Sequence, residues 1–174
     1  MEQVTINLYS FDELSENAKE IALIKLCDIN VDHAWWEWTY EDAKNVGMKI
    51  KSFDLYRNDI DIDFLYSMDD IASKIMSDHG NECQTYLLSS LFLQNRGELV
   101  AKYSDGINTE LVHEDNFDEF DEELEELEKD YMQALKCEYL SILEKEYEYL
   151  TSSESIIETI KCNEYQFTED GSIF

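Results

Sequence analysis

Acidic side chains dominate one stretch of the chain, and their spacing is regular. Of the seventeen residues from Glu114 to Asp130, eleven are Asp or Glu and one is basic. In a helix, carboxylates three or four residues apart lie about 5–6 Å from one another on the same face. This separation is close to that of successive phosphates along a nucleic-acid strand. The carboxylates that would share the face are Asp118, Asp121, Glu122, Glu125 and Glu128.

Like charges at this spacing repel one another, at a cost of a few tenths of a kcal/mol per pair. A helix that keeps them despite this cost indicates a use for the charge, as an imitation of a row of phosphates. The alternative is the solvated face of an amphipathic helix whose apolar stripe lies on the opposite side. The sequence leaves both interpretations open.

A second acidic row is predicted on a strand. Asp59, Asp61 and Asp63 alternate with apolar residues, so the three side chains point to one face, about 6.6–6.8 Å apart. One interpretation is a second row of the same phosphate mimic. Another is a Mg²⁺ or Ca²⁺ site, although carboxylates this far apart on one strand do not converge on one ion. The simplest interpretation is an exposed strand face.

The whole chain is strongly acidic. Its 41 Asp and Glu against 13 Lys and Arg give a formal net charge of −28 over 174 residues. A field of this sign repels anionic surfaces, which disfavours nucleic acid and anionic membranes as direct ligands. It favours basic partner surfaces, and nucleic-acid-binding clefts are the commonest large ones. Hydrophobic residues at 44% argue against disorder, so the charge either serves a folded interface or only keeps a folded chain soluble.

Catalytic motifs are missing from the sequence. It contains no GxSxG, Walker, GxGxxG or HExxH pattern, and its three histidines are isolated. We therefore expect a non-enzymatic protein with no catalytic residue, no cofactor and no metal ligand. His79 is interpreted as a helix C-terminal residue that meets the helix dipole. The four scattered cysteines predict reduced core residues in a cytoplasmic protein, and the lack of a leader or a long apolar run predicts no membrane association.

Hydrophobic periodicity predicts an α+β fold in a single domain over residues 1–174, with helices packed on a small antiparallel sheet. Ser15 is expected to cap a helix, Gly47 and Asn58 to form turns, and Gly80 and Gly97 to follow helix ends. The aromatic run from Trp35 to Tyr40 predicts packing between sheet and helix, or an anchor for a partner. The predicted elements are a strand at 4–8, one turn of helix after Ser10, helices at 15–31 and 32–46, strands at 48–57 and 59–66, helices at 68–80 and 82–95, a loop at 98–115, a helix roughly 50 Å long at 116–150, and a C-terminal helix and hairpin at 152–174.

Two parts of the sequence resemble a known group of proteins. YSFDELSENAKEIA with WWEWTYEDAKNVGMKIKSFDL, and later YEYLTSSESIIETIKCNEYQFTEDG, are similar to the opening and closing phrases of small phage- and prophage-encoded proteins. The resemblance covers residues 4–56 and 146–171 and brings no catalytic motif. It implies a phage setting, and loosely similar proteins belong among phage counter-defence factors, including anti-CRISPR proteins. Residues 57–145, which carry both acidic rows, lie outside it.

The charge and the resemblance together predict a phage inhibitor that acts in the cytoplasm of the host bacterium. It would bind the basic DNA-binding surface of a host defence protein, with a Cas effector as the expected target, and would not itself bind nucleic acid. An alternative is an intracellular interaction or assembly module that forms a homodimer through the long helix. A third is a metal-dependent hydrolase that uses carboxylates.

Overall fold

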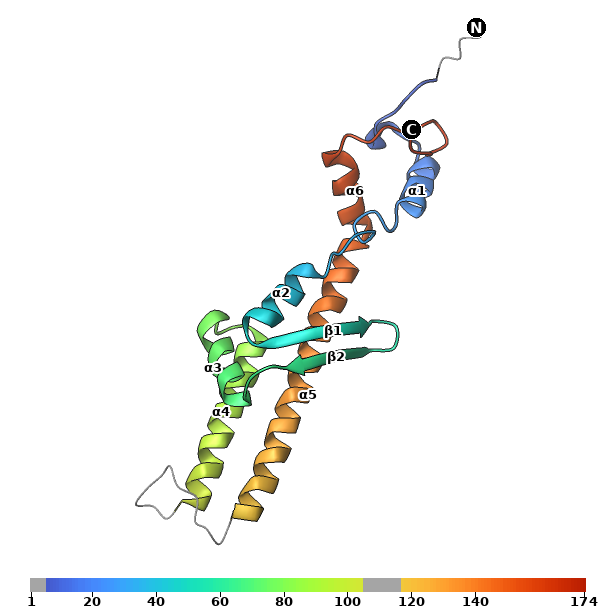
Figure 1. The fold of residues 1–174 in the computed structure, drawn as a ribbon. Helices are drawn as coiled ribbons and strands as arrows, with labels where there is room; N and C mark the ends of the chain where they lie inside the picture. Colours follow the sequence, from blue (N-terminus) through green and yellow to red (C-terminus); the bar gives the residue numbers. More distant parts are fainter. Residues whose placement is uncertain (1–5, 105–116) are drawn as a thin grey trace. The chain divides into compact units, whose positions relative to one another are not determined.

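The computed structural model describes residues 6–104 and 117–174, in which six α-helices and a two-stranded antiparallel sheet form an α+β fold, as predicted (Figure 1). Contacts divide the chain into two compact units, described here one at a time. Unit 1 comprises Met1–Trp36 and Glu144–Phe174, and unit 2 comprises Glu37–Leu143. The long helix α5 (Phe117–Leu150) contributes residues to both, and its length agrees with the prediction. The single domain expected over residues 1–174 stays a prediction.

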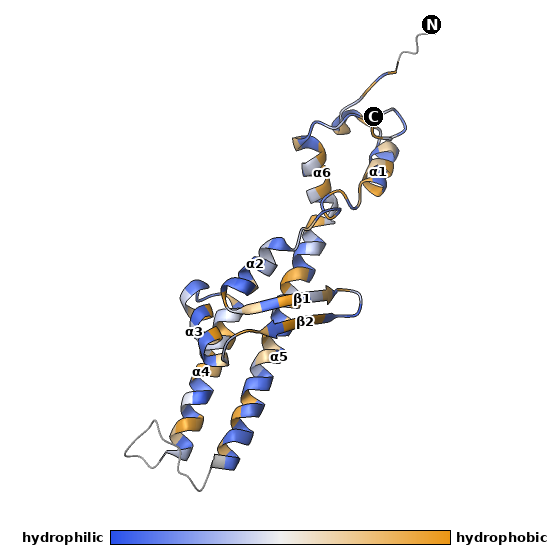
Figure 2. Ribbon diagram, in the orientation of Figure 1, coloured by the Kyte–Doolittle hydropathy of each residue, from blue (hydrophilic) through white to orange (hydrophobic). Residues whose placement is uncertain are grey.

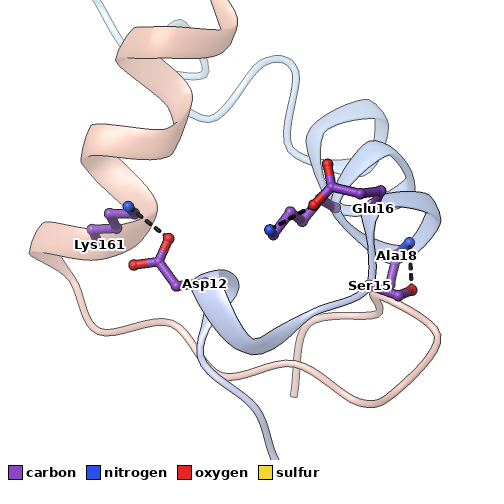
Figure 3. Close-up of polar contacts among 6 residues, drawn as sticks. Asp12, Ser15, Glu16, Ala18 and Lys161 are labelled. Carbon is purple, nitrogen blue, oxygen red and sulfur yellow. Dashed lines mark hydrogen bonds and ion pairs between the residues drawn. The ribbon is translucent and has the colours of Figure 1, made fainter.

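Unit 1 has its core around Phe167, whose side chain is fully buried. Ser15 caps the first helix as expected, since its hydroxyl accepts a hydrogen bond of 3.3 Å from the amide of Ala18. Nζ of Lys161 lies 2.7 Å from Oδ1 of Asp12, which joins two of the elements (Figure 3). The elements of unit 1 are the short 3₁₀ helix η1 (Phe11–Glu13), α1 (Glu16–Lys25), α6 (Ser153–Cys162) and the end of α5.

The C-terminal turn of unit 1 forms where the Asp-Gly signal predicts it. Gly171 has a φ of +79°, and a Cβ there would collide with the carbonyl group of Ala18, so only glycine suits the position. The flanking strands are reduced to isolated bridges, from Phe167 to Tyr9 and to Ile173. Residues 6–8 are not in a strand, which corrects the N-terminal strand expected at 4–8; residues 4 and 5 lie outside the described residues.

Unit 2 combines the sheet with a group of helices. Its strands pair antiparallel, with Met48 opposite Phe64, and Asn58 makes the predicted turn at a φ of +54°. Ile50, Ile60 and Ile62 are buried from one side of the hairpin. Apolar and polar residues alternate along α5 in the manner of an amphipathic helix (Figure 2). The elements are α2 (Glu37–Asn45), β1 (Met48–Asp54), β2 (Asp59–Phe64), α3 (Met68–Asp78), α4 (Gln84–Tyr103) and residues 117–143 of α5.

Four helix boundaries differ from the prediction. α1 ends at Lys25 rather than near residue 31, because residues 26–31 form turns. α2 begins at Glu37 rather than near residue 32, because residues 32–36 form bends and turns. α3 ends at Asp78, two residues before the expected 80, with His79 as its C-cap, and Gly80 follows the helix end as predicted. α4 continues through Gly97 to Tyr103, so Gly97 does not end it and residues 98–103 are not a loop. The helix gains by continuing, because Leu99 and Tyr103 beyond the glycine are buried. Residues 105–116 of the expected loop lie outside the described residues.

All four cysteines are free and exposed, so the prediction of core cysteines was wrong. Each occupies a position that faces water. Cys27 follows α1, Cys83 is the N-cap of α4, and Cys162 is the last residue of α6. Cys137 lies on the solvent side of α5, where the amide of Gln133 contacts its sulfur at 3.4 Å.

Candidate protein-binding surface

Four of the five predicted helix carboxylates lie on the exposed side of α5. We call Asp118, Asp121, Glu122 and Glu125 the exposed acid row. Among the residues that the structure describes, no cation lies within ion-pair distance of any of them. A rigid helix therefore holds this group of negative charges, about 10 Å long from first to last, open to solvent.

Glu128 departs from this row. Seven residues fall about 20° short of two full helical turns, so Glu128 is rotated from Asp121 toward the buried stripe, and Leu135 seven residues later is fully buried. Burial raises the pKa of the Glu128 carboxyl, and the nearby charge of Asp69 raises it further, while Arg96 opposes both. Glu128 thus faces the surroundings of α3 and α4, where Arg96 pairs with Asp69 at 2.8 Å.

Glu123 belongs to an ion pair that the sequence did not indicate. Nζ of Lys102 donates to both Glu123 carboxylate oxygens, at 2.7 and 2.8 Å, and the hydroxyl of Tyr103 donates at 2.9 Å. The contact with Lys102, followed by that with Tyr103, lowers the pKa of Glu123. Because residues 98–115 were expected to be a loop, no helical pattern placed Lys102 opposite the acidic helix.

The strand row is exposed but partly neutralised. Nζ of Lys51 lies 2.8 Å from Oδ2 of Asp61 and 2.9 Å from Oδ1 of Asp63. The register explains this bridge, because the irregularity between Ile50 and Ser52 puts Lys51 across from both aspartates. Hydrogen bonds to Asp61 and Asp63 raise the pKa of Lys51. Of the predicted row, only Asp59 has no cation within ion-pair distance among the described residues.

The two predicted rows do not merge into one surface. The hairpin β1–β2 and the N-terminal end of α5 are well separated within unit 2 (Figure 1). Among residues 6–104 and 117–174, no hydrogen bond or ion pair joins the strand aspartates to the exposed acid row. A partner that contacts both rows must therefore be large.

A polar network inside unit 2 was missed by the sequence analysis. Nδ1 of His79 lies 2.7 Å from the hydroxyl of Thr85, and its Nε2 lies 3.4 Å from Oδ1 of Asp42. Burial would raise the pKa of Asp42, but the contacts with His79 and Tyr139 more than offset this and lower it. A chain of contacts from Asp42 through His79 to Thr85 could activate the threonine hydroxyl as a nucleophile. Thr85 is only 4% exposed, however, so a substrate carbonyl cannot reach its hydroxyl in this conformation.

The aromatic run does not pack between sheet and helix as one group, because Trp35 belongs to unit 1 and the sheet belongs to unit 2. Trp35 is buried in unit 1, where its ring lies 5.7 Å from that of Trp36 and 5.6 Å from that of Tyr147. Trp38, on α2 of unit 2, is 78% exposed. Trp35 therefore packs in the interior, and Trp38 has the exposure that a partner anchor needs.

No group of three or more His, Cys, Asp or Glu in the described part of the chain could hold a metal ion. None of the described helices combines the length and the apolar character needed to cross a bilayer.

No protein-family model matches the chain, and no curated protein or solved structure is significantly similar to it. The candidate site is therefore assigned only from the sequence and structure of this chain.

Proposed function

We propose that this chain is a non-enzymatic phage counter-defence protein that acts as an acidic nucleic-acid mimic in the bacterial cytoplasm. It binds the basic DNA-binding surface of a host protein, for which a Cas effector is the favoured candidate. The observation that carries this proposal is the exposed acid row, four carboxylates on one rigid helix with no cation paired to them among the described residues.

Physical chemistry supports a binding role for such a row. In the free protein, the neighbouring carboxylates of the row repel one another. Cations of a basic cleft would reduce this repulsion by forming ion pairs with them. Long-range attraction between a chain of net charge −28 and a basic surface also speeds encounter, and it weakens as salt rises. The same field repels phosphate, so the protein does not bind nucleic acid itself.

The test is competition with DNA. Guide-loaded Cas effectors are titrated with labelled target DNA at several fixed concentrations of this protein. A mimic raises the apparent Kd for DNA in proportion to its own concentration, because both occupy one cleft. Cleavage blocked while DNA stays bound would contradict mimicry, and direct binding of this protein to duplex DNA would contradict it more seriously.

A pair of variants with equal charge locates the surface. One variant neutralises the exposed acid row with Asp118→Asn, Asp121→Asn, Glu122→Gln and Glu125→Gln. The control neutralises four other exposed carboxylates with Glu20→Gln, Asp28→Asn, Glu158→Gln and Glu169→Gln. Both lose four charges, so a loss of competition in the first variant alone assigns the surface to α5.

The alternative of a homodimer has one observation in its favour. Leu87 and Leu91 of α4 are about half exposed, and Leu91 lines an apolar groove with Leu127 of α5. Burial of this groove against a second copy would stabilise a dimer. Sedimentation equilibrium over a wide concentration range decides the matter, since a monomer at all concentrations rejects the assembly module.

A further inference from the structure

A hollow of about 620 Å³ lies beside α2 and the start of β1, within unit 2. Its apolar surface comes from Tyr40, Ile50 and Leu65. Such a volume lies within the range of small-molecule sites, which combine apolar walls with a few polar groups. Its charged rim consists of Glu37, Glu41, Lys44 and Lys49.

The chain path between α2 and β1 creates this hollow. Residues 37, 40, 41 and 44 follow helical spacing and so present one face of α2 to it. Gly47, at a φ of +92°, then turns the chain into β1, and its carbonyl accepts a hydrogen bond of 2.9 Å from the amide of Leu65. That bond fixes Leu65 at the wall of the hollow, where the side chain remains 52% exposed.

Two lysines lie at the rim of the hollow. The chain has 41 acidic residues, and the cations that follow in the hairpin form ion pairs with some of them. Lys51 pairs with Asp61 and Asp63, and Arg57 pairs with Asp54. Lys44 and Lys49 have no ion-pair partner among the residues that the structure describes. Lys44, near the end of α2, and Lys49, near the start of β1, place two cations at one end of this apolar hollow, beside the rim carboxylates Glu37 and Glu41, and this end attracts an anion.

We propose that this hollow binds an organic anion with a flat apolar body. Its carboxylate, sulfonate or phosphate group contacts Lys44 and Lys49, and its body covers Tyr40 and Leu65, above the buried Ile50. Burial of an exposed leucine and an aromatic ring supplies the apolar part of the affinity, at about 25 cal/mol per Å² removed from water. This site is independent of the acid row and of the proposed inhibitor role.

The acidic residues of the rim orient the ligand. Glu37 lies seven residues before Lys44 on α2, about 10 Å along the helix axis. That distance is close to the screening length at physiological salt, so Glu37 repels an anion at the lysine end only weakly. Glu41 is one turn from Lys44 and disfavours the reversed orientation, in which the anion would lie over Tyr40 and the acidic end.

The experiment compares three probes of one shape and different charge. Indole-3-acetate is the anion, indole-3-acetamide is neutral and tryptamine is the cation. Each is titrated into the full chain, and binding is followed by NMR through the methyl groups of Ile50 and Leu65 and the ring of Tyr40. Indole-3-acetate is expected to shift these signals saturably and to bind about tenfold more tightly than the amide, equivalent to about 1.4 kcal/mol.

Two variants and one control test the assigned contacts. Lys44→Gln with Lys49→Gln should remove the preference for the anion, and Leu65→Ala should weaken all three probes. The control, Lys129→Gln with Lys145→Gln, loses the same charge at exposed lysines outside the hollow and should bind as the wild type does. Circular dichroism confirms that each variant is folded.

The outcomes are decisive in both directions. Tighter binding of tryptamine, equal binding of the three probes, or anion binding unchanged in the Lys44/Lys49 variant would overturn the proposal. So would the absence of saturable shifts at Ile50, Leu65 and Tyr40 in the millimolar range. Anion-selective shifts at these residues that vanish with the two lysines, but not in the control, establish the site.

Discussion

The phenol of Tyr139 donates a hydrogen bond of 2.8 Å to Oδ2 of Asp42. Tyr139 is fully buried in unit 2, so this donor has no access to water. Burial, followed by the charge of Asp42, raises the pKa of Tyr139 and keeps the phenol protonated. The bond thereby ties α5 to α2 through groups that are 97 residues apart in the chain.

Tyr139→Phe should lower the free energy of unfolding by about 1.5–3 kcal/mol, because the lost hydrogen bond is made to a charged group. Asp42→Asn should cost less, since the amide oxygen still accepts. Urea unfolding of both variants and of the double variant measures the coupling directly. Additive losses would show that the bond contributes nothing of its own.

The stability of the wild type should fall in acid partly through Asp42. Its pKa is lower in the folded chain than its ordinary value of 3.8, so the folded state binds fewer protons than the unfolded state. The contribution is complete above pH 3.8 and is lost as the pH falls through the folded pKa. The difference in unfolding free energy between wild type and Asp42→Asn should therefore shrink below pH 3.8.

Local signals in the sequence predicted much of the fold. Ser15 as a cap, Gly47 and Asn58 as turns, and the long amphipathic helix all depend on the chemistry of a few neighbouring residues. The helix end predicted at Gly97 was wrong. A glycine inside a helix costs about 1 kcal/mol, which is less than the free energy gained by burying Leu99 beyond it.

The candidate site was predictable only in part. Periodicity placed the exposed acid row, but it could not show that Lys51 bridges Asp61 and Asp63, since that depends on strand register and on the irregularity in β1. The contact of Lys102 with Glu123 and that of His79 with Asp42 join different elements, and no single-sequence pattern encodes such pairs.

Neutralising the exposed acid row should leave the protein as stable as before or more stable. The four substitutions to Asn and Gln remove repulsion between neighbours, at a few tenths of a kcal/mol per pair, and break no ion pair with a described residue. Thermal unfolding at low salt should show an equal or higher Tm, and the difference should diminish as salt screens the repulsion. A lower Tm would mean that these carboxylates stabilise the fold.

Asn30→Ala should destabilise unit 1. The buried Asn30 side chain donates to the carbonyl of Leu150 at 2.9 Å and to Oγ of Ser155 at 3.1 Å, and accepts from Thr159 at 2.7 Å. Its removal leaves these groups without their partner, at about 1–3 kcal/mol for each that stays buried. Hydrogen exchange should report faster opening of α6. Unchanged exchange there would show that water replaces the amide without loss.

Lys51→Gln tests whether the strand row contributes to binding. The change breaks two exposed ion pairs, so it should cost at most about 1 kcal/mol of stability. It also leaves Asp61 and Asp63 without their neutralising cation. A partner that contacts this row should associate faster with the variant at low salt, because electrostatic steering grows with local charge.

Lys74→Gln is the matched control, since it also removes one positive charge and one exposed ion pair, that of Lys74 with Asp78 on α3. If the two variants accelerate association equally, only the net charge matters and the partner contacts α5 alone. Faster association of the Lys51 variant than of the Lys74 variant places the strand row inside the interface.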